Sequence, residues 1–222
     1  FILFKPRDFV SGDFYWAQDK EDYVYFTAAD CTGHGVPGAF MSMLGMAFLN
    51  EIVNKFDDID PHEVLNQLRK YIIKAMNQIG QEGEAKDGMD MVVCKLNKKT
   101  NELKYACANN PLFLIRDGEL IKTKGDPMPV SIHLKMDPFT PHTVQLQPGD
   151  SIYIFSDGYA DQFGGPKMKK FMQKQFRELL TSISKNDMKK QGQILDDTIE
   201  KWKGWGDTLE QIDDIVVIGV KF

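Results

Sequence analysis

Short apolar runs alternate with polar turns along much of this chain. An Asp117-Gly118 pair follows one of these runs and is a typical hairpin turn signal. Because the runs follow one another in hairpin order, the pattern predicts antiparallel sheets. The runs are rich in the β-branched and aromatic residues that strands prefer, and they cover residues 1–4, 23–29, 91–96, 103–108, 112–115, 151–156 and 215–220.

Other segments have the spacing of apolar positions that helices need. Residues 61–79 open with Asp60 as N-cap and Pro61 at the first helical position. The lysine-rich part of the third segment, Lys167 to Lys174, is interpreted as one solvated helix face. Together with the strands, this pattern predicts one α+β domain over residues 1–222. The predicted helices cover residues 38–54, 61–79, 167–183 and 187–202.

Composition narrows the function classes. The chain has 222 residues, 42% of them hydrophobic, and a net charge of −5 without a basic stripe, so we expect no nucleic-acid partner. Gly38, Ser42 and Gly45 interrupt the longest apolar run, 36–49, which predicts a buried helix and no membrane contact. Three cysteines without a CxxC pair indicate free thiols and a cytoplasmic domain.

Aspartates stand beside several of the predicted strands. Asp13 follows a Ser-Gly turn, Asp30 ends the run 23–29, Asp157 follows SIYIFS, and Asp213-Asp214 precedes IVVIGV. Each of them alone is explained by a turn or a cap. Several carboxylates brought together would repel one another and need cations, and oxygen ligands suit Mg²⁺ or Mn²⁺. The four histidines are scattered without HxH or HExxH spacing, which argues against zinc.

The sequence resembles the metal-dependent protein phosphatases of the protein phosphatase 2C (PP2C) superfamily. The bacterial branch of stage II sporulation protein E and sigma-factor-regulator phosphatases matches best. The resemblance implies an αββα sandwich, in which two antiparallel sheets are flanked by helix pairs. The matching blocks are VSGDFYW (10–16), ADCTGHGVPGAFMSML (29–44), DGMDMVV (87–93), NNPLFLIRDG (109–118), LQPGDSIYIFSDGYADQFGG (146–165) and QIDDIVVIGV (211–220).

The same resemblance implies roles for individual residues around two divalent ions, Mn²⁺ or Mg²⁺. Asp30 resembles the carboxylate that bridges them, and the neighbouring Cys31 would offer only its backbone carbonyl. Asp157 and Asp213 resemble ligands of the first ion, with Asp214 ranked behind Asp213. Asp13 corresponds to an acidic residue that acts through water near the second ion.

Three further residues have weaker correspondence. Asp87 matches an aspartate that holds a weaker third ion. His34 lies four residues after Asp30, whereas in eukaryotic relatives a histidine lies two residues after the bridging aspartate, so stabilising the turn is the competing role for His34. Arg7 is a candidate for binding the substrate phosphate, and an ordinary surface position explains it equally well.

The function expected from these observations is hydrolysis of phosphoserine or phosphothreonine on a regulatory protein by water activated between two ions. No arginine-bearing phosphate loop follows a cysteine, which argues against thiol chemistry. Two alternatives stay open: a non-catalytic module with the phosphatase fold, and a metal hydrolase of small phosphoesters. The resemblance suggests an anti-sigma-factor antagonist domain as the substrate, an upstream sensor domain in the full-length protein, and a homodimer.

Overall fold

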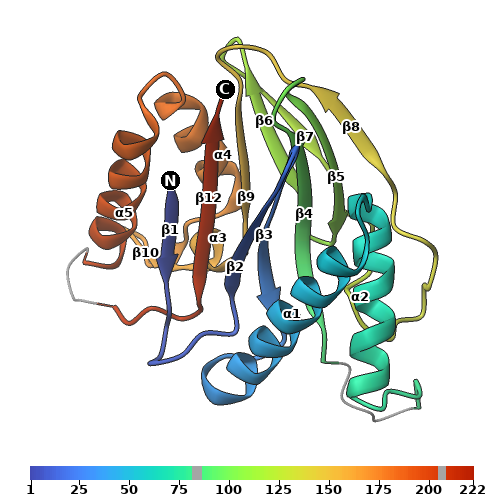
Figure 1. Cartoon of the computed structure of the whole chain (residues 1–222). Coiled ribbons are helices and arrows are strands. Elements are labelled where there is room, and N and C mark those ends of the chain that lie inside the picture. Colours follow the sequence, from blue (N-terminus) through green and yellow to red (C-terminus); the bar gives the residue numbers. More distant parts are fainter. Residues whose placement is uncertain (82–86, 205–208) are drawn as a thin grey trace.

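Two antiparallel sheets pack face to face, and helices cover their outer faces, in a computed structural model that describes residues 1–81, 87–204 and 209–222 (Figure 1). This arrangement confirms the expected αββα sandwich. The first sheet, here called the β12 sheet, has the strand order β1-β12-β9-β6-β7, and the second, the β3 sheet, has the order β2-β3-β4-β5-β8. Two short strands, β10 and β11, form a separate hairpin.

The strands of the β12 sheet are β1 (Ile2–Lys5), β12 (Ile215–Lys221), β9 (Ser151–Phe155), β6 (Leu112–Arg116) and β7 (Glu119–Thr123). Those of the β3 sheet are β2 (Phe14–Lys20), β3 (Tyr23–Cys31), β4 (Met89–Asn97), β5 (Glu102–Ala108) and β8 (His142–Gln145). The hairpin strands are β10 (Phe163–Gly164) and β11 (Lys169–Lys170). The helices are α1 (Gly35–Lys55), α2 (Pro61–Ala75), α3 (Gly158–Asp161), α4 (Gln173–Ile183) and α5 (Met188–Lys203).

Three apolar layers hold the sandwich together, one between the sheets and one beneath each helix pair. Val92 and Ile154 lie in the central layer, Leu68 of α2 belongs to the layer under α1 and α2, and Phe176 and Leu195 lie under α4 and α5. All five side chains are 1% exposed or less. Burial of this apolar surface is the main stabilising contribution to the fold.

Helix α1 has the length and apolar composition that a membrane span would need, and it alone among the described helices passes that test. In the structure, however, it packs against β2, β3 and α2. Met41, Leu49, Ile52 and Val53 on its inner side are all buried. The buried helix predicted from the sequence is therefore what the structure shows, with its start three residues earlier than expected, at Gly35.

Two predicted helices are shorter than expected. The second ends at Ala75, and a turn follows where Asn77 takes a left-handed conformation, with φ 51°. The third begins at Gln173, so the prediction of a helix from Lys167 was wrong. The preceding residues turn back as the β10–β11 hairpin, because Gly165, Met168 and Met172 all have positive φ, which no helix accommodates. Strands β2, β7, β8, β10 and β11 were not among the predicted strands.

Candidate metal centre

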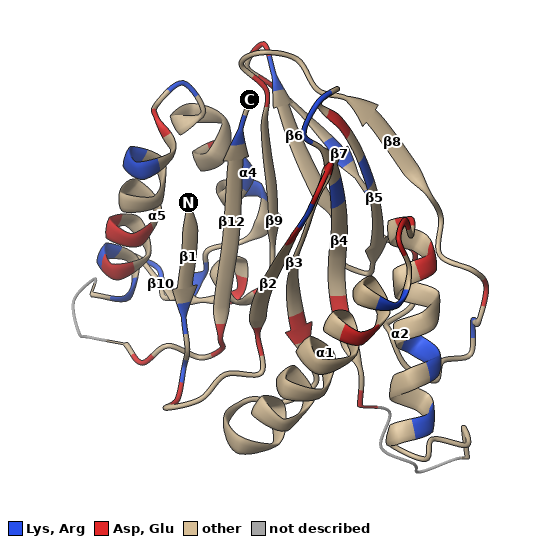
Figure 2. Ribbon diagram, viewed as in Figure 1, with Lys and Arg blue, Asp and Glu red and all other residues tan. Residues whose placement is uncertain are grey.

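The antiparallel topology brings the aspartates of distant segments to one end of the sandwich. Asp30 lies at the end of β3, where β2 and β4 begin, so Asp13 and Asp90 lie at the same end of this sheet. In the other sheet, Asp157 follows β9 at the point where Asp213 leads into β12. Figure 2 shows this acidic end at the tip of β3 and the beginning of β4.

A cleft of about 330 Å³ opens between these strand ends. Carboxylates from both sheets line it, and none of the described lining residues is Lys or Arg. Asp30 and Asp90 are directly opposite each other in the antiparallel pairing of β3 and β4, an arrangement that is destabilising for two like charges. The lining consists of Asp30, Cys31, Thr32, Gly33, His34, Asp90, Asp157 and Asp213.

The carboxylates oppose one another's ionisation. Burial, followed by the charges of Asp13 and Asp157, raises the pKa of Asp30 to about 9. Burial is also the main cause that raises the pKa of Asp13 to about 8 and that of Asp157 to about 6. The pKa of Asp213 is raised as well, again chiefly by burial. A site of this kind favours any positive charge that enters it.

Asp13 lies behind the cleft rather than in its lining. Its side chain is 4% exposed, and its Oδ2 atom is buried without a hydrogen-bond partner. The side chain of Asp214 fixes the loop that carries it, since Oδ1 accepts the Arg7 N–H at 2.7 Å and Oδ2 accepts the Gly12 N–H at 2.8 Å. The hydroxyl of Ser42 on α1 lies 2.7 Å from the Gly12 carbonyl and can donate to it. Both carboxylate oxygens of Asp214 thus accept hydrogen bonds from the loop that contains Asp13.

Glycines let the chain turn sharply away from Asp30 into α1. Gly33 and Gly35 have φ of 86° and 62°, the left-handed region that glycine enters without strain. A Cβ on Gly38 would lie 2.2 Å from the Gly33 carbonyl oxygen, so only glycine fits where α1 meets this turn. The turn keeps the end of β3 open to the cleft.

The remaining predicted residues take different places. His34 lines the cleft and caps α1, and its Nδ1 lies 3.2 Å from Asp8 Oδ2. The Arg7 guanidinium donates to the Ile212 carbonyl at 3.1 Å and does not belong to the lining. Asp87 is also outside the lining, and its carbonyl accepts from Gln78 Nε2 at 2.6 Å.

Sequence reasoning missed Asp90, the second aspartate of the DGMD block. Asn109 Nδ2 donates to its Oδ1 at 2.8 Å, and Asn110 Nδ2 donates to its carbonyl at 3.1 Å. The Asn-Asn-Pro block therefore positions a cleft carboxylate. The sequence did offer one indication, a charged residue inside the apolar strand MDMVV. Its place in the site follows only from the pairing of Asp90 with Asp30 in the sheet.

The donor set fits hydrated hard cations. Within the described ranges, no three Asp, Glu, His or Cys side chains gather closely enough to enclose one ion by themselves. An ion in the cleft would therefore keep several water ligands, as Mg²⁺ usually does. The unpaired Asp13 oxygen and the mutually repelling carboxylates both call for positive charge at this place.

Comparisons with known proteins identify the family and the fold. The family described as Stage II sporulation protein E (SpoIIE) matches residues 20–222. The SiaA-PP2C domain of Pseudomonas aeruginosa is similar with a TM-score of 0.88 and 28% identity, over 100% of this chain and 85% of that one. The SpoIIE structure from Bacillus subtilis contains a PP2C phosphatase domain with a fragment of the regulatory domain. It is similar with a TM-score of 0.78 and 18% identity, over 99% of this chain and 60% of that one.

A structure of RsbX in complex with magnesium has the same fold, with a TM-score of 0.64 and 15% identity over 98% of this chain and 92% of that one. A search of curated protein sequences gave no match.

Proposed function

Since this chain belongs to the SpoIIE family of PP2C-type phosphatase domains, we propose that it is a metal-dependent phosphatase acting on phosphoserine or phosphothreonine of a regulatory protein. The observation that carries the proposal is the cleft itself. Carboxylates from both sheets meet there, and burial together with their mutual repulsion raises the pKa of Asp30 to about 9. Such a site is suited to divalent cations and to little else.

Asp30, Asp157 and Asp213 would hold two Mn²⁺ or Mg²⁺ ions, with the Cys31 carbonyl as a further donor and Asp13 acting through water. Asp90 lines the same cleft, opposite Asp30, whereas Asp87 does not line it. Asp90 is therefore a better candidate than Asp87 for binding a third ion. When bound, such ions supply Lewis-acid charge and an activated water for the hydrolysis of a phosphate monoester.

The chain's own residues exclude a phospho-enzyme route through cysteine. Cys31 is 4% exposed, and burial raises the pKa of its thiol far above the usual value. A thiol in this state stays protonated and is a poor nucleophile. Water is therefore the nucleophile that the site would supply, and the carboxylates would orient it and take up its proton.

Exposed apolar side chains next to the cleft favour a protein substrate over a small phosphoester. Val36 and Phe40, on the first turns of α1, are 62% and 64% exposed, close to the lining residue His34. Large apolar side chains grouped at a site mark contacts with another macromolecule. The anti-sigma-factor antagonist class remains our proposal for that substrate.

The test compares p-nitrophenyl phosphate with a phosphoserine protein, each with and without Mn²⁺. We expect metal-dependent turnover of both and a higher kcat/KM for the phosphoprotein. Turnover confined to small phosphoesters would favour the alternative hydrolase. Absence of any turnover by well-folded, metal-loaded protein would favour the non-catalytic module.

A further inference from the structure

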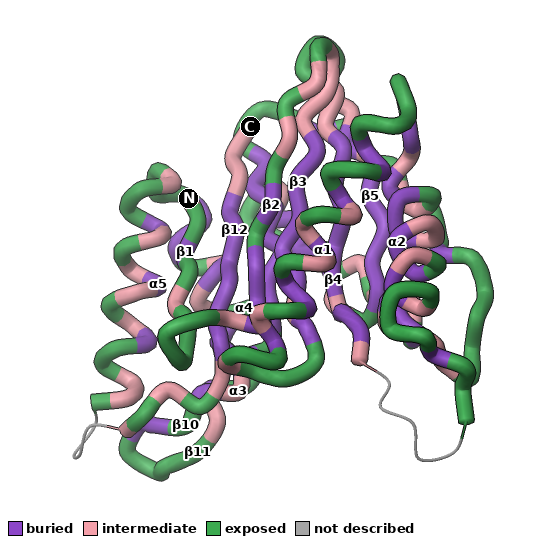
Figure 3. Tube along the Cα trace, turned by 60° about the horizontal axis from the view of Figure 1, so that its bottom comes forward, coloured by how far each residue is buried: buried purple, intermediate pink, exposed green. Residues whose placement is uncertain are grey.

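The lysine-rich stretch at residues 167–170 lies beside the metal centre. Lys170 Nζ is 2.6 Å from Asp161 Oδ2, and Asp161 belongs to α3, which begins immediately after Asp157. Residues four apart on a helix lie on the same side, one turn from each other. Lys170 is therefore about one helical turn from the cleft carboxylate Asp157. We call residues 163–172 the lysine hairpin; Figure 3 shows its strands β10 and β11 next to α3.

The lysine hairpin is fixed to the body of the domain. The Gly165 N–H donates to the Trp202 carbonyl at 2.9 Å, and a Cβ on Gly164 would lie 2.1 Å from that carbonyl oxygen. The rings of Phe171 and Trp202 meet edge to face with centroids 5.2 Å apart. Met172 N–H donates to the Ala160 carbonyl at 2.7 Å. A hairpin held in this way presents its outer side chains at constant positions relative to Asp157.

Two cations on the hairpin have no partner of opposite charge. Lys167 and Lys169 are exposed, and neither amine forms an ion pair with any residue in the described part of the chain. Such amines are available to a ligand at little cost in lost contacts. They belong to the same hairpin as Lys170, which lies about one helical turn from a cleft whose described lining contains only acidic and neutral side chains and His34.

The hairpin also exposes apolar side chains. Phe163, Met168 and Met172 are 41%, 52% and 57% exposed. Met168 and Met172 have φ of 49° and 74°, a conformation that is strained for residues with a side chain and that occurs most often at functional sites. Exposed methionine and phenylalanine among lysines form a surface that adapts to a peptide carrying acidic and apolar residues.

We propose that the lysine hairpin binds acidic residues that flank the phosphorylated serine or threonine of a protein substrate. The inference rests on the proposed phosphatase function and names the feature by which a substrate is chosen. Lys167 and Lys169 would bind carboxylates of the substrate, while Met168 and Met172 cover its neighbouring apolar side chains. The hairpin is thus a local group of positive charge on a chain whose net charge is −5.

The test uses two phosphoserine peptides of equal length that differ only in having Glu or Gln on both sides of the phosphoserine. Their kcat/KM values are measured in Mn²⁺ for wild type and for Lys167→Gln/Lys169→Gln. We expect wild type to prefer the Glu peptide about tenfold or more, a difference of ~1.4 kcal/mol. In the double variant the preference should fall to about twofold or less, and salt should weaken it in wild type.

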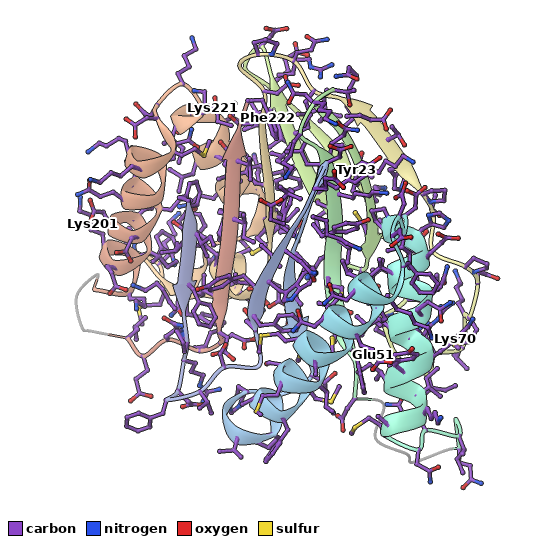
Figure 4. The ribbon with its side chains drawn as sticks, viewed as in Figure 1. Tyr23, Glu51, Lys70, Lys201, Lys221 and Phe222 are labelled. Atoms are coloured by element: carbon purple, nitrogen blue, oxygen red, sulfur yellow. The ribbon has the colours of Figure 1, made fainter. Side chains whose placement is uncertain are left out.

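Lys189→Gln/Lys190→Gln is the matched control, since it removes the same charge from exposed positions on the first turn of α5. That turn lies near the end of β12, because the Lys221 amine donates to the Asn186 carbonyl at 3.2 Å, whereas the cleft lies where β12 begins. Figure 4 labels Lys221 at this far end. The control should keep the wild-type preference for the Glu peptide.

A binding measurement separates this proposal from the proposed function. The same two peptides, with a non-hydrolysable phosphonate in place of the phosphate, are titrated by fluorescence anisotropy in Mn²⁺. Tighter binding of the Glu peptide by wild type, lost in the hairpin variant, supports docking even if no turnover is seen. Equal binding of the two peptides, or hairpin-dependent binding to phosphatidylserine vesicles in place of the Glu peptide, would overturn the proposal.

Discussion

At the scale of single residues, Asp30 combines a proposed role as a metal ligand with a cost in stability. Its carboxylate lies opposite Asp90 and within the field of Asp13 and Asp157, and burial with these charges raises its pKa to about 9. Asp30→Asn keeps the shape of the side chain but removes the charge. We therefore expect turnover to fall below about a tenth of the wild-type rate, a barrier increase of more than ~1.4 kcal/mol.

The same variant should be more stable than wild type when both are free of metal. At neutral pH a carboxyl group with a folded-state pKa of about 9 must take up a proton on folding, and this lowers the free energy of unfolding. Asparagine has no such cost, so the free energy of unfolding should rise by ~1 kcal/mol or more. Urea denaturation in EDTA measures this. A less stable Asp30→Asn protein would show that the repulsion among the cleft carboxylates is not the dominant interaction there.

Cys31 is expected to behave differently from its neighbour. Its thiol is buried and stays protonated, and only its backbone carbonyl is proposed to bind an ion. Cys31→Ser should retain more than about half of the wild-type rate, with a small loss of stability from placing a hydroxyl in an apolar site. An inactive Cys31→Ser protein that is folded by circular dichroism would point back to thiol chemistry.

The raised pKa values also determine how the stability of the metal-free protein depends on pH. With pKa values of about 8 for Asp13 and about 9 for Asp30, the folded chain binds more protons than the unfolded chain above about pH 4. The stability that these groups contribute is present at low pH and is lost as the pH rises through these two values. Between about pH 6 and about pH 9, Tm in EDTA should therefore fall.

A divalent cation should remove that fall, because its charge offsets the repulsion among the carboxylates. Thermal melts in EDTA and in MgCl₂ across this pH range make the comparison. A constant or rising Tm in EDTA, relative to MgCl₂, would contradict the assignment of these groups to one cluster.

The sequence made candidates of Asp13, Asp30, Asp157 and Asp213, since each stands at the edge of an apolar run, and the structure brings the last three to one cleft. It missed Asp90, because strand pairing rather than sequence distance brings that residue to Asp30. The loop-fixing contacts of Asp214 were also out of reach, because they join Arg7 and Gly12 to a residue about two hundred positions away. The pattern of residues along the chain does not show which strands pair or in which register, so it cannot predict such long-range contacts.

At the scale of elements, the N-terminal end of α1 is coupled to the site by close backbone packing. A Cβ at position 38 would lie 2.2 Å from the Gly33 carbonyl oxygen and 2.8 Å from Gly12 Cα. Gly38→Ala should therefore displace the turn after Asp30, lower the free energy of unfolding by about 2 kcal/mol or more and reduce turnover. Chemical denaturation and phosphatase assays measure the two effects.

Gly45→Ala in the same helix is the control. A Cβ there would meet the ends of the Met89 and Phe14 side chains at 2.8 and 2.9 Å, and these can move aside. Its cost should stay below about 1 kcal/mol, partly offset by the better helix propensity of alanine. Equal effects of the two substitutions would show that the contact between α1 and the turn does not shape the site.

Helices and strands were predicted well where the spacing of apolar residues reflects burial. They were predicted poorly where the prediction depended on a run of charged residues. Seven strands of the two sheets were predicted to within two residues of their observed bounds, and the amphipathic helix α2 was predicted with its correct start but four residues too long. The Lys167–Lys174 stretch was taken for a solvated helix face, but Met168 and Met172 have positive φ there and the chain turns back on itself. The hairpin packs against Trp202, a residue distant in sequence, so this conformation could not be predicted from the local sequence pattern.

At the scale of the whole molecule, the sandwich explains how so distant a set of residues forms one site. The β3 sheet contributes Asp30 and Asp90, and the ends of the β12 sheet contribute Asp157 and Asp213. The pattern of apolar runs predicted the α+β class, and the resemblance carried by six ordered sequence blocks predicted the αββα arrangement. The choice of substrate depends on surfaces outside those ligands, of which the lysine hairpin is our candidate.

The most direct test of the central claim is a metal titration of activity. Protein stripped exhaustively with a chelator is titrated with Mn²⁺ while turnover of a phosphoserine peptide is followed, for wild type and for Asp157→Asn. We expect no turnover in the stripped proteins, saturable recovery in wild type, and less than about a tenth of that rate in the variant. Full turnover by stripped wild-type protein, or full recovery of Asp157→Asn at the same Mn²⁺ concentration, would contradict it.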